Sequence, residues 1–156
     1  MTRWLDATEQ QHWRAWVAAS TLLRERLSHE LQAEHAISLS DYEILVRLSE
    51  APNRSMRMSA LADHTLASRS RLSHQIDRME KAGMVRREAC PSDRRGQLAV
   101  LTEDGWDALV AAAPTHVEGV RRHLVDVLTP AQFSALGQAS RLVADGLNDC
   151  EADRVG

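Results

Sequence analysis

The chain has 156 residues, of which 44% are hydrophobic and 26% are charged, and its net charge is −3. These values are typical of a soluble globular protein that buries its own core and needs neither disulfides nor a metal for folding. No apolar run reaches the roughly 18 residues of a membrane span, and the polar start of the chain argues against a secretory signal, so we expect a cytoplasmic protein.

The distribution of charge along the chain is uneven. Residues 54–95 contain ten basic and five acidic side chains, although the chain as a whole is acidic. A basic segment in an otherwise acidic chain is typical of a site for a polyanion. This segment is therefore the first candidate for a nucleic-acid interface.

A long amphipathic helix is predicted over residues 8–34. Its capping pair is either Asp6 with Glu9 or Thr8 with Gln11, because both pairs have the spacing of a helix N-cap and its partner. Apolar residues recur at helical spacing at Trp13, Trp16, Val17, Leu23, Leu27 and Leu31.

A second helix is predicted to begin at Ser40. Ser40 and Glu43 match a capping box, and Leu39 can pack on Ile44 as a hydrophobic staple. The Ala-Pro-Asn break at 51–53 ends this helix.

Two short helices joined by a tight turn follow. The first covers about 57–64 with Ser59 as its cap, and the second begins after Ser68 and ends at Gly83. The buried face of the second consists of Leu72, Ile76 and Met79. This pair predicts a helix-turn-helix.

A β-hairpin is predicted next, with strands at 84–87 and 97–101. The loop between them, 90–96, contains Pro, Ser, Asp and Gly, which favour turns, and two arginines. The sequence therefore predicts a hairpin with a basic tip.

Two further helices complete the chain. The first runs from Thr102 to about Leu128 and contains Pro114, which can kink it, and the second covers about 130–148 behind a cap at Thr129 and Gln132. The predicted order is α-α-α-α-β-β-α-α, a mainly α fold with one small β-hairpin.

The helix that follows Ser68 presents side chains that suit base edges and phosphates in a DNA major groove. These are Arg69, Ser70, Arg71, Ser73, His74 and Arg78. At the hairpin tip, Arg94 and Arg95 lie on an arm slender enough for the minor groove. The alternative interpretation is a solvated arginine-rich surface without a partner, and the basic hairpin directly downstream disfavours it.

These segments resemble the MarR family of bacterial regulators. The resemblance lies in the runs 61–62, 68–87, 93–96 and 98–105, above all in an Asp-x-Arg motif followed by alternating apolar residues and Leu-Thr-x-x-Gly. It implies a winged helix-turn-helix protein that acts as a transcriptional regulator, which we expect to be a repressor, with no cofactor.

The resemblance also implies a homodimer. Residues 1–38 and 105–156 would then supply dimerisation helices, and residues 39–104 would form the DNA-binding lobe. A two-fold dimer would recognise a pseudo-palindromic operator in double-stranded DNA, with half-sites roughly 10 bp apart.

Site residues follow from the resemblance position by position. Ser68 would be the N-cap, and Arg69, Ser70, Arg71, Ser73 and His74 would face the DNA. Arg95 would enter the minor groove, and Asp93 would orient the wing. His74 departs from the Arg or Lys common in relatives and would make binding mildly pH-dependent.

Members of the family commonly release DNA when a small, often aromatic and anionic, effector binds beside the DNA-binding lobe. The candidate lining here is His12, Trp13, Trp16, Tyr42 and Arg47, which combines aromatic surface with partners for an anion. Ordinary packing of the two tryptophans is the alternative interpretation.

Metal and redox sensing are weaker interpretations. The histidines at 29, 35, 116 and 123 have no metal-ligand spacing, so surface or capping roles are favoured and no metal site is predicted. Cys90 and Cys150 lack CxxC spacing and are interpreted as reduced thiols. Arg86 and Arg87 could nevertheless lower the pKa of Cys90.

The sequence disfavours two other classes of function. An enzyme is disfavoured because the chain has no glycine-rich phosphate loop, no GxSxG and no HExxH. A winged-helix protein-interaction module without DNA binding is the remaining alternative, and the arginines on both helix and hairpin disfavour it.

Overall fold

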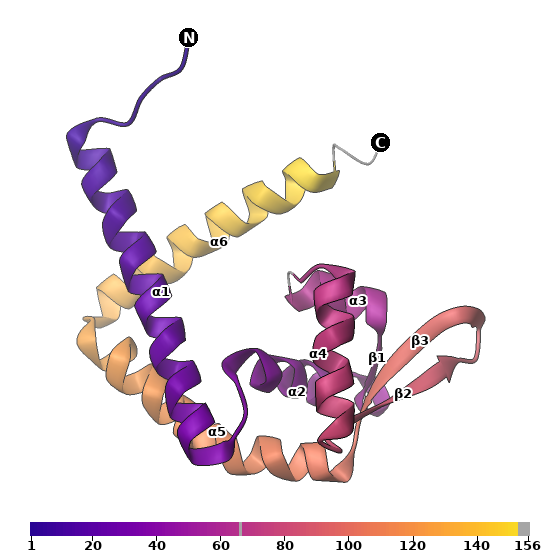
Figure 1. Ribbon diagram of the computed structural model, residues 1–156. Coiled ribbons are helices and arrows are strands. Elements are labelled where there is room, and N and C mark those ends of the chain that lie inside the picture. Colours follow the sequence, from indigo (N-terminus) through magenta and orange to yellow (C-terminus); the bar gives the residue numbers. More distant parts are fainter. Residues whose placement is uncertain (66, 153–156) are drawn as a thin grey trace. The chain divides into compact units, whose positions relative to one another are not determined.

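The computed structural model describes residues 1–65 and 67–152, with the side chains of Arg94 and residues 148–152 outside that description (Figure 1). The described chain is mainly helical with a small three-stranded sheet, which confirms the predicted winged-helix fold class. It divides into two compact units, one of residues 1–117 and one that begins at Glu118, and each is described by itself. No helix in the described ranges combines the length and the apolar character needed to cross a membrane.

Helix α1 spans Ala7–His35. Of the two capping pairs compatible with the sequence, Asp6 and Glu9 form the capping box, with Glu9 N–H donating to Asp6 Oδ1 at 2.8 Å and Asp6 N–H to Glu9 Oε2 at 2.9 Å. Leu27 and Leu31 are buried, whereas Trp13 and Trp16 are 57% and 49% exposed. The C-terminal half of the predicted apolar face is therefore buried, whereas the two tryptophans of its N-terminal half are exposed.

Helix α2 spans Leu39–Glu50 and begins one residue earlier than predicted. Its cap is Ser38 with Asp41, not Ser40 with Glu43, so this prediction was wrong. The earlier start fits the packing, because Leu39 is buried and its N–H donates to Ser28 Oγ of α1 at 3.2 Å.

Strand β1, Ser55–Arg57, follows the short 3-10 helix η1, Pro52–Arg54, and neither was predicted. It pairs antiparallel with β3, so the sheet has the order β1-β3-β2 in place of the predicted two-stranded hairpin. Three residues are too few to display a strand periodicity, and only their pairing with residues 98–100 makes them a strand.

The helix-turn-helix consists of α3, Met58–Thr65, and α4, Arg69–Lys81. Ser68 caps α4 as predicted, accepting the Arg71 N–H at 3.2 Å, and Gly83 ends it with a φ of 76°. Helix α3 begins before Ser59, so Ser59 is not its cap. The predicted face of α4, Leu72, Ile76 and Met79, is buried.

Strands β2, Val85–Cys90, and β3, Asp93–Leu101, form the wing. They are longer than predicted, and the seven-residue loop contracts to a turn at Pro91 and Ser92. A register shift between Ala89 and Cys90 marks an irregularity near the tip.

Helix α5, Glu103–His123, continues through Pro114 but ends before Leu128, and η2, Val125–Val127, follows it. Helix α6 spans Pro130–Ala152. Its predicted cap is confirmed, because Gln132 N–H donates to Thr129 Oγ1 at 3.3 Å and Thr129 N–H to Gln132 Oε1 at 2.9 Å.

Candidate nucleic-acid interface

The N-terminal half of α4 carries two exposed arginines that form no ion pair with the part of the chain that the structure describes. Arg69 and Arg71 are exposed, and neither forms an ion pair with any residue that the structure describes. Ser70 and His74 are also exposed, whereas Ser73 is half-buried. The helix therefore offers charges and hydroxyl groups at the end that recognition helices present to DNA bases.

A polar hollow of about 430 Å³ lies against this end of α4. Residues of α4 and of the start of α2 line it: Ser40, Ser68, Ser70, Arg71, His74, Gln75 and Arg78. Five of these seven were predicted site residues, four as DNA contacts and Ser68 as the cap of the helix. Ser40 and Gln75 were not, and Ser40 comes from α2, which no sequence spacing connects to α4.

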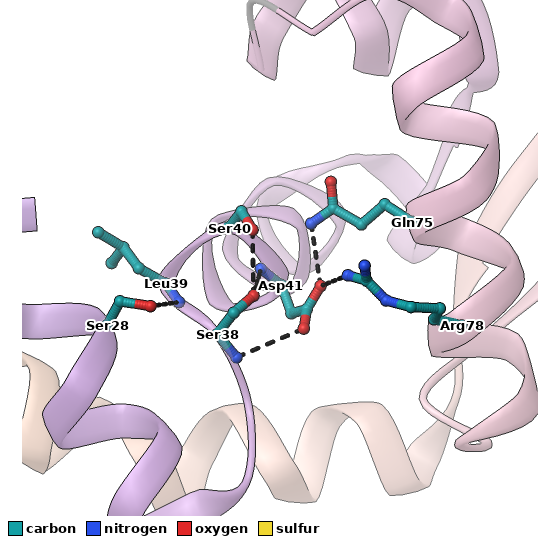
Figure 2. Close-up of polar contacts among 7 residues, drawn as sticks. All are labelled: Ser28, Ser38, Leu39, Ser40, Asp41, Gln75 and Arg78. Atoms are coloured by element: carbon teal, nitrogen blue, oxygen red, sulfur yellow. Dashed lines mark hydrogen bonds and ion pairs between the residues drawn. The ribbon is translucent and has the colours of Figure 1, made fainter. Parts of the chain in front are cut away.

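Arg78, a predicted DNA contact, is held by the protein itself. Its Nη2 lies 3.3 Å from Asp41 Oδ1, and Gln75 Nε2 donates to the same oxygen at 2.9 Å (Figure 2). The Arg78 side chain remains 66% exposed. Arg78 thus combines an exposed position with an attachment to α2.

Arg87 of β2 fastens the wing to α4. Its Nη1 lies 2.7 Å from Asp77 Oδ1 and 2.9 Å from Glu80 Oε2, and its Nη2 donates to Ser73 O at 3.0 Å and Ser73 Oγ at 3.3 Å. The Arg87 side chain is only 16% exposed. Ser73, predicted to face DNA, therefore contacts the wing in this structure.

Asp93 organises the tip of the wing. Its Oδ1 accepts the Arg95 N–H at 3.0 Å, and its Oδ2 lies 3.6 Å from Arg57 Nη1 of β1. Arg57 also donates to Ser92 Oγ at 2.9 Å. Asp93 and Arg95 are both exposed, and the side chain of Arg94 lies outside the described residues.

Cys90 is buried at the base of this tip. A hydrogen bond with Ser92, whose Oγ lies 3.4 Å from the sulfur, lowers the pKa of the Cys90 thiol, and the charge of Arg57 contributes in the same direction. The arginines expected to do so, at positions 86 and 87, are engaged elsewhere by Glu88, Asp77 and Glu80. Cys150 lies outside the described side chains.

A second hollow, of about 550 Å³, contains two of the five predicted effector residues, Tyr42 and Arg47. The others, His12, Trp13 and Trp16, are exposed on α1 and do not line it. The full lining is Arg24, Tyr42, Glu43, Val46, Arg47, Glu50, His64, Thr65 and His116.

His116 brings an unusual polar group to this hollow. Its ring lies 4.5 Å from that of Tyr42, and its Nδ1 is buried with no hydrogen-bond partner among the described residues. Burial lowers the pKa of His116 and raises that of Tyr42, so both rings are neutral near pH 7. No sequence pattern predicted that Tyr42 and His116 would be in contact.

The histidines considered as metal ligands do not assemble into a site. Within the described residues, no three His, Cys, Asp or Glu side chains are grouped as a metal ion requires. His35 instead lies 2.8 Å from Thr115 Oγ1 through its Nε2, and His29 is exposed.

A helix-turn-helix is present whose second helix is capped and carries arginines with no ion-pair partner among the described residues. Together with the basic β-wing beside it, this defines the class of winged-helix DNA-binding proteins. The MarR family model matches residues 37–96. Two solved structures from Streptomyces coelicolor match nearly the whole chain. Sco3205, a MarR family regulator in complex with DNA, is 48% identical over 94% of this chain and 92% of its own, with a TM-score of 0.91.

AbsC, also a MarR family transcriptional regulator, is 49% identical over 95% of this chain and 99% of its own, with a TM-score of 0.90. The chain therefore belongs to the MarR family of transcriptional regulators. PecS, a regulator from Dickeya dadantii (strain 3937), is 29% identical over 112 residues, which cover 70% of this chain but only 64% of PecS.

Proposed function

We propose that the protein is a cytoplasmic transcriptional repressor that binds a pseudo-palindromic operator as a homodimer and is released by a small effector. The observation that carries DNA binding is that Arg69 and Arg71, on the exposed start of α4, have no ion-pair partner among the described residues, while Arg95 is exposed on the wing. The DNA complex of Sco3205, a relative 48% identical to this chain, supports the same conclusion.

Exposed apolar side chains support the homodimer. A monomer that is stable alone rarely leaves so many large apolar side chains in water, and a second copy of the chain would bury them. On α1 and the segment before it they are Trp4, Leu5, Trp13, Trp16, Val17 and Leu22, and on α6 they are Phe133, Leu142, Val143 and Leu147.

The test of DNA binding is selection of bound duplexes from a random library, followed by titration of the selected sequence over a salt series. We expect a pseudo-palindromic sequence whose binding constant falls with salt, because phosphate contacts release counterions. Sedimentation equilibrium should show a dimer. Binding that is absent, or insensitive to salt, would favour the protein-interaction module instead.

Loss of the Arg71 side chain and loss of the Arg95 side chain should affect DNA binding differently. Arg71→Ala is expected to weaken operator binding by about 1–3 kcal/mol and to relax specificity at one position of each half-site, since α4 reads bases. Arg95→Ala should weaken binding to operator and unrelated duplexes alike. Arg121→Ala, which removes an exposed arginine paired with Asp126 in the other compact unit, is the control and should change neither. Unimpaired operator binding by both variants would refute the assignment.

The hollow beside Tyr42 is our candidate effector site. Arg47 is exposed there without an ion-pair partner among the described residues, and the rings of Tyr42 and His116 contact each other in the same hollow, so a small aromatic anion fits the lining. His12, Trp13 and Trp16 stay candidates for a lid that a partner subunit would complete. A panel of aromatic carboxylates, beginning with benzoate, should release DNA from the unmodified protein but not from Arg47→Ala.

A further inference from the structure

We propose that Asp41 is a positioning residue for DNA recognition. In this proposal, which rests on the proposed DNA binding, Asp41 fixes the recognition helix α4 to α2 through Gln75 and Arg78. In this role the two side chains hold α4 in position and do not themselves contact DNA. Asp41 was not singled out by sequence and belongs to no predicted site.

The Asp41 carboxylate accepts three hydrogen bonds, two from side chains of α4 and one from the N-cap residue of α2 (Figure 2). Asp41 Oδ1 accepts from Gln75 Nε2 at 2.9 Å and from Arg78 Nη2 at 3.3 Å, while Oδ2 accepts the Ser38 N–H at 3.4 Å. The Asp41 side chain is only 14% exposed, although Arg78 is 66% exposed. A carboxylate so far withdrawn from water depends on these donors, and hydrogen bonds to a charged group are the stronger kind.

The place of these bonds on α4 explains why they matter. Gln75 and Arg78 are three residues apart, so they lie on one face of the helix, one turn from Arg71 and His74. Both line the polar hollow whose other wall is Ser40 of α2. The rest of α4 packs on α3 and β2, so Asp41 is its polar attachment on the α2 side.

A loosened α4 should harm sequence reading more than general DNA affinity. Bidentate contacts to base edges require the helix to lie within a fraction of an ångström of its proper place, whereas phosphate contacts tolerate displacement. We therefore expect loss of Asp41 to lower the ratio of operator affinity to non-specific affinity, with little effect on the non-specific term.

The experiment compares Asp41→Ala, Asp41→Asn, Arg78→Gln and the double variant D41A/R78Q with the unmodified protein. Each is titrated with the selected operator and with a scrambled duplex over a salt series, at a temperature where circular dichroism shows it folded. Asp41→Ala should lower the operator-to-scrambled ratio about tenfold, equivalent to about 1.4 kcal/mol. The ratio for Asp41→Asn should lie between those of Asp41→Ala and the unmodified protein. The ratio for the double variant should be no lower than that for Asp41→Ala alone.

Ser38→Ala is the matched control. It removes the hydroxyl that accepts the Asp41 N–H at 3.1 Å and so weakens the same helix start, but it leaves the contacts to α4 in place. Its operator ratio should equal that of the unmodified protein. Hydrogen exchange without DNA provides a second readout, in which Asp41→Ala should accelerate exchange of α4 amides and Ser38→Ala should not.

Two results would overturn the proposal. If Arg78→Gln reduces the slope of log affinity against log salt by about one, Arg78 contacts a phosphate and is not reserved for Asp41. If Asp41→Ala and Ser38→Ala give the same operator ratio and the same α4 exchange, Asp41 only caps its own helix. Failure of the unmodified protein to bind any duplex would refute the proposed function, and the exchange measurement would still decide the role of Asp41.

Discussion

Replacing Gly105 with alanine is expected to lower the free energy of unfolding by about 3 kcal/mol, because the new methyl group has no room. A Cβ built on Gly105 would lie 2.8 Å from Leu101 Cδ1 and 2.9 Å from the Met84 carbonyl carbon, and closer still to the Met84 oxygen. Urea unfolding at one fixed protein concentration measures the change.

The Met84 carbonyl cannot retreat, because its oxygen accepts the Thr102 N–H at 3.2 Å. Thr102 in turn donates through Oγ1 to Gly83 O at 2.6 Å and accepts the Gly105 N–H at 3.0 Å. The Thr-x-x-Gly sequence thus fastens the start of α5 against the start of β2. Relaxation of one partner would disturb the others.

Gly146→Ala is the matched control for this prediction. Gly146 also lies in a helix, but a Cβ there meets nothing within 4 Å. Because alanine favours a helix over glycine by roughly 0.5–1 kcal/mol, this variant should be as stable as the unmodified protein or more so. Equal destabilisation by both substitutions would contradict the close-contact explanation.

Arg87→Ala is expected to cost about 2 kcal/mol of folding free energy, because it removes charge-assisted hydrogen bonds that join the wing to α4. Asp77 and Glu80 would lose their shared cation, and Ser73 O would lose a donor. We also expect weaker operator binding, since α4 and the wing would no longer be held together. Urea unfolding and operator titration measure the two effects.

Arg86→Ala separates this effect from the loss of any arginine. Arg86 is the neighbouring residue on the same strand, but its side chain is 53% exposed and pairs only with Glu88 on the same strand, among the described residues. Exposed pairs contribute about 0–1 kcal/mol, so Arg86→Ala should change stability little. A similar loss in both variants would show that Arg87 has no special role.

Acid should weaken the same attachment. Hydrogen bonds from the Arg87 backbone N–H and then from its side chain hold the pKa of Glu80 below its ordinary value of 4.5. A carboxyl whose pKa is lowered by folding stabilises the fold above its ordinary pKa, and this stabilisation is lost as the pH falls through the folded value. We therefore compare the urea midpoint of unfolding at pH values above and below 4.5. As the pH is lowered, this midpoint should decrease more in the unmodified protein than in Glu80→Gln.

Much of the structure of α4 is predictable from the sequence because the signals that set it are local. The cap at Ser68, the stop at Gly83 and the buried face of α4 depend on residues within a few positions of one another, and all three agree with the structure. The periodic spacing of apolar residues in the helices and the cap at Thr129 are also local signals. The order of elements that such signals predict was sufficient to choose the fold class.

The elements that were missed depend on partners distant in sequence. Strand β1 exists because residues 55–57 pair with residues 98–100, and α2 begins at Leu39 because Leu39 packs inside and bonds to Ser28. Neither partner is near enough in the chain to leave a periodic or spacing signal. The cap was predicted at Ser40, whereas Ser38 caps α2 in the structure, which fits the burial of Leu39.

By itself, the sequence determined roughly where the six helices lie and which face of α4 is buried, since propensity, capping and periodicity act over one or two turns. It also showed that positive charge gathers on α4 and the wing. Only the tertiary structure decided which of those charges are engaged. Arg78 and Arg87 look like Arg69 and Arg71 in the sequence, yet Asp41, Asp77 and Glu80 hold the first two and leave the others exposed. An ion pair depends on distance in space, and residues 41 and 78 meet only after α2 and α4 have packed.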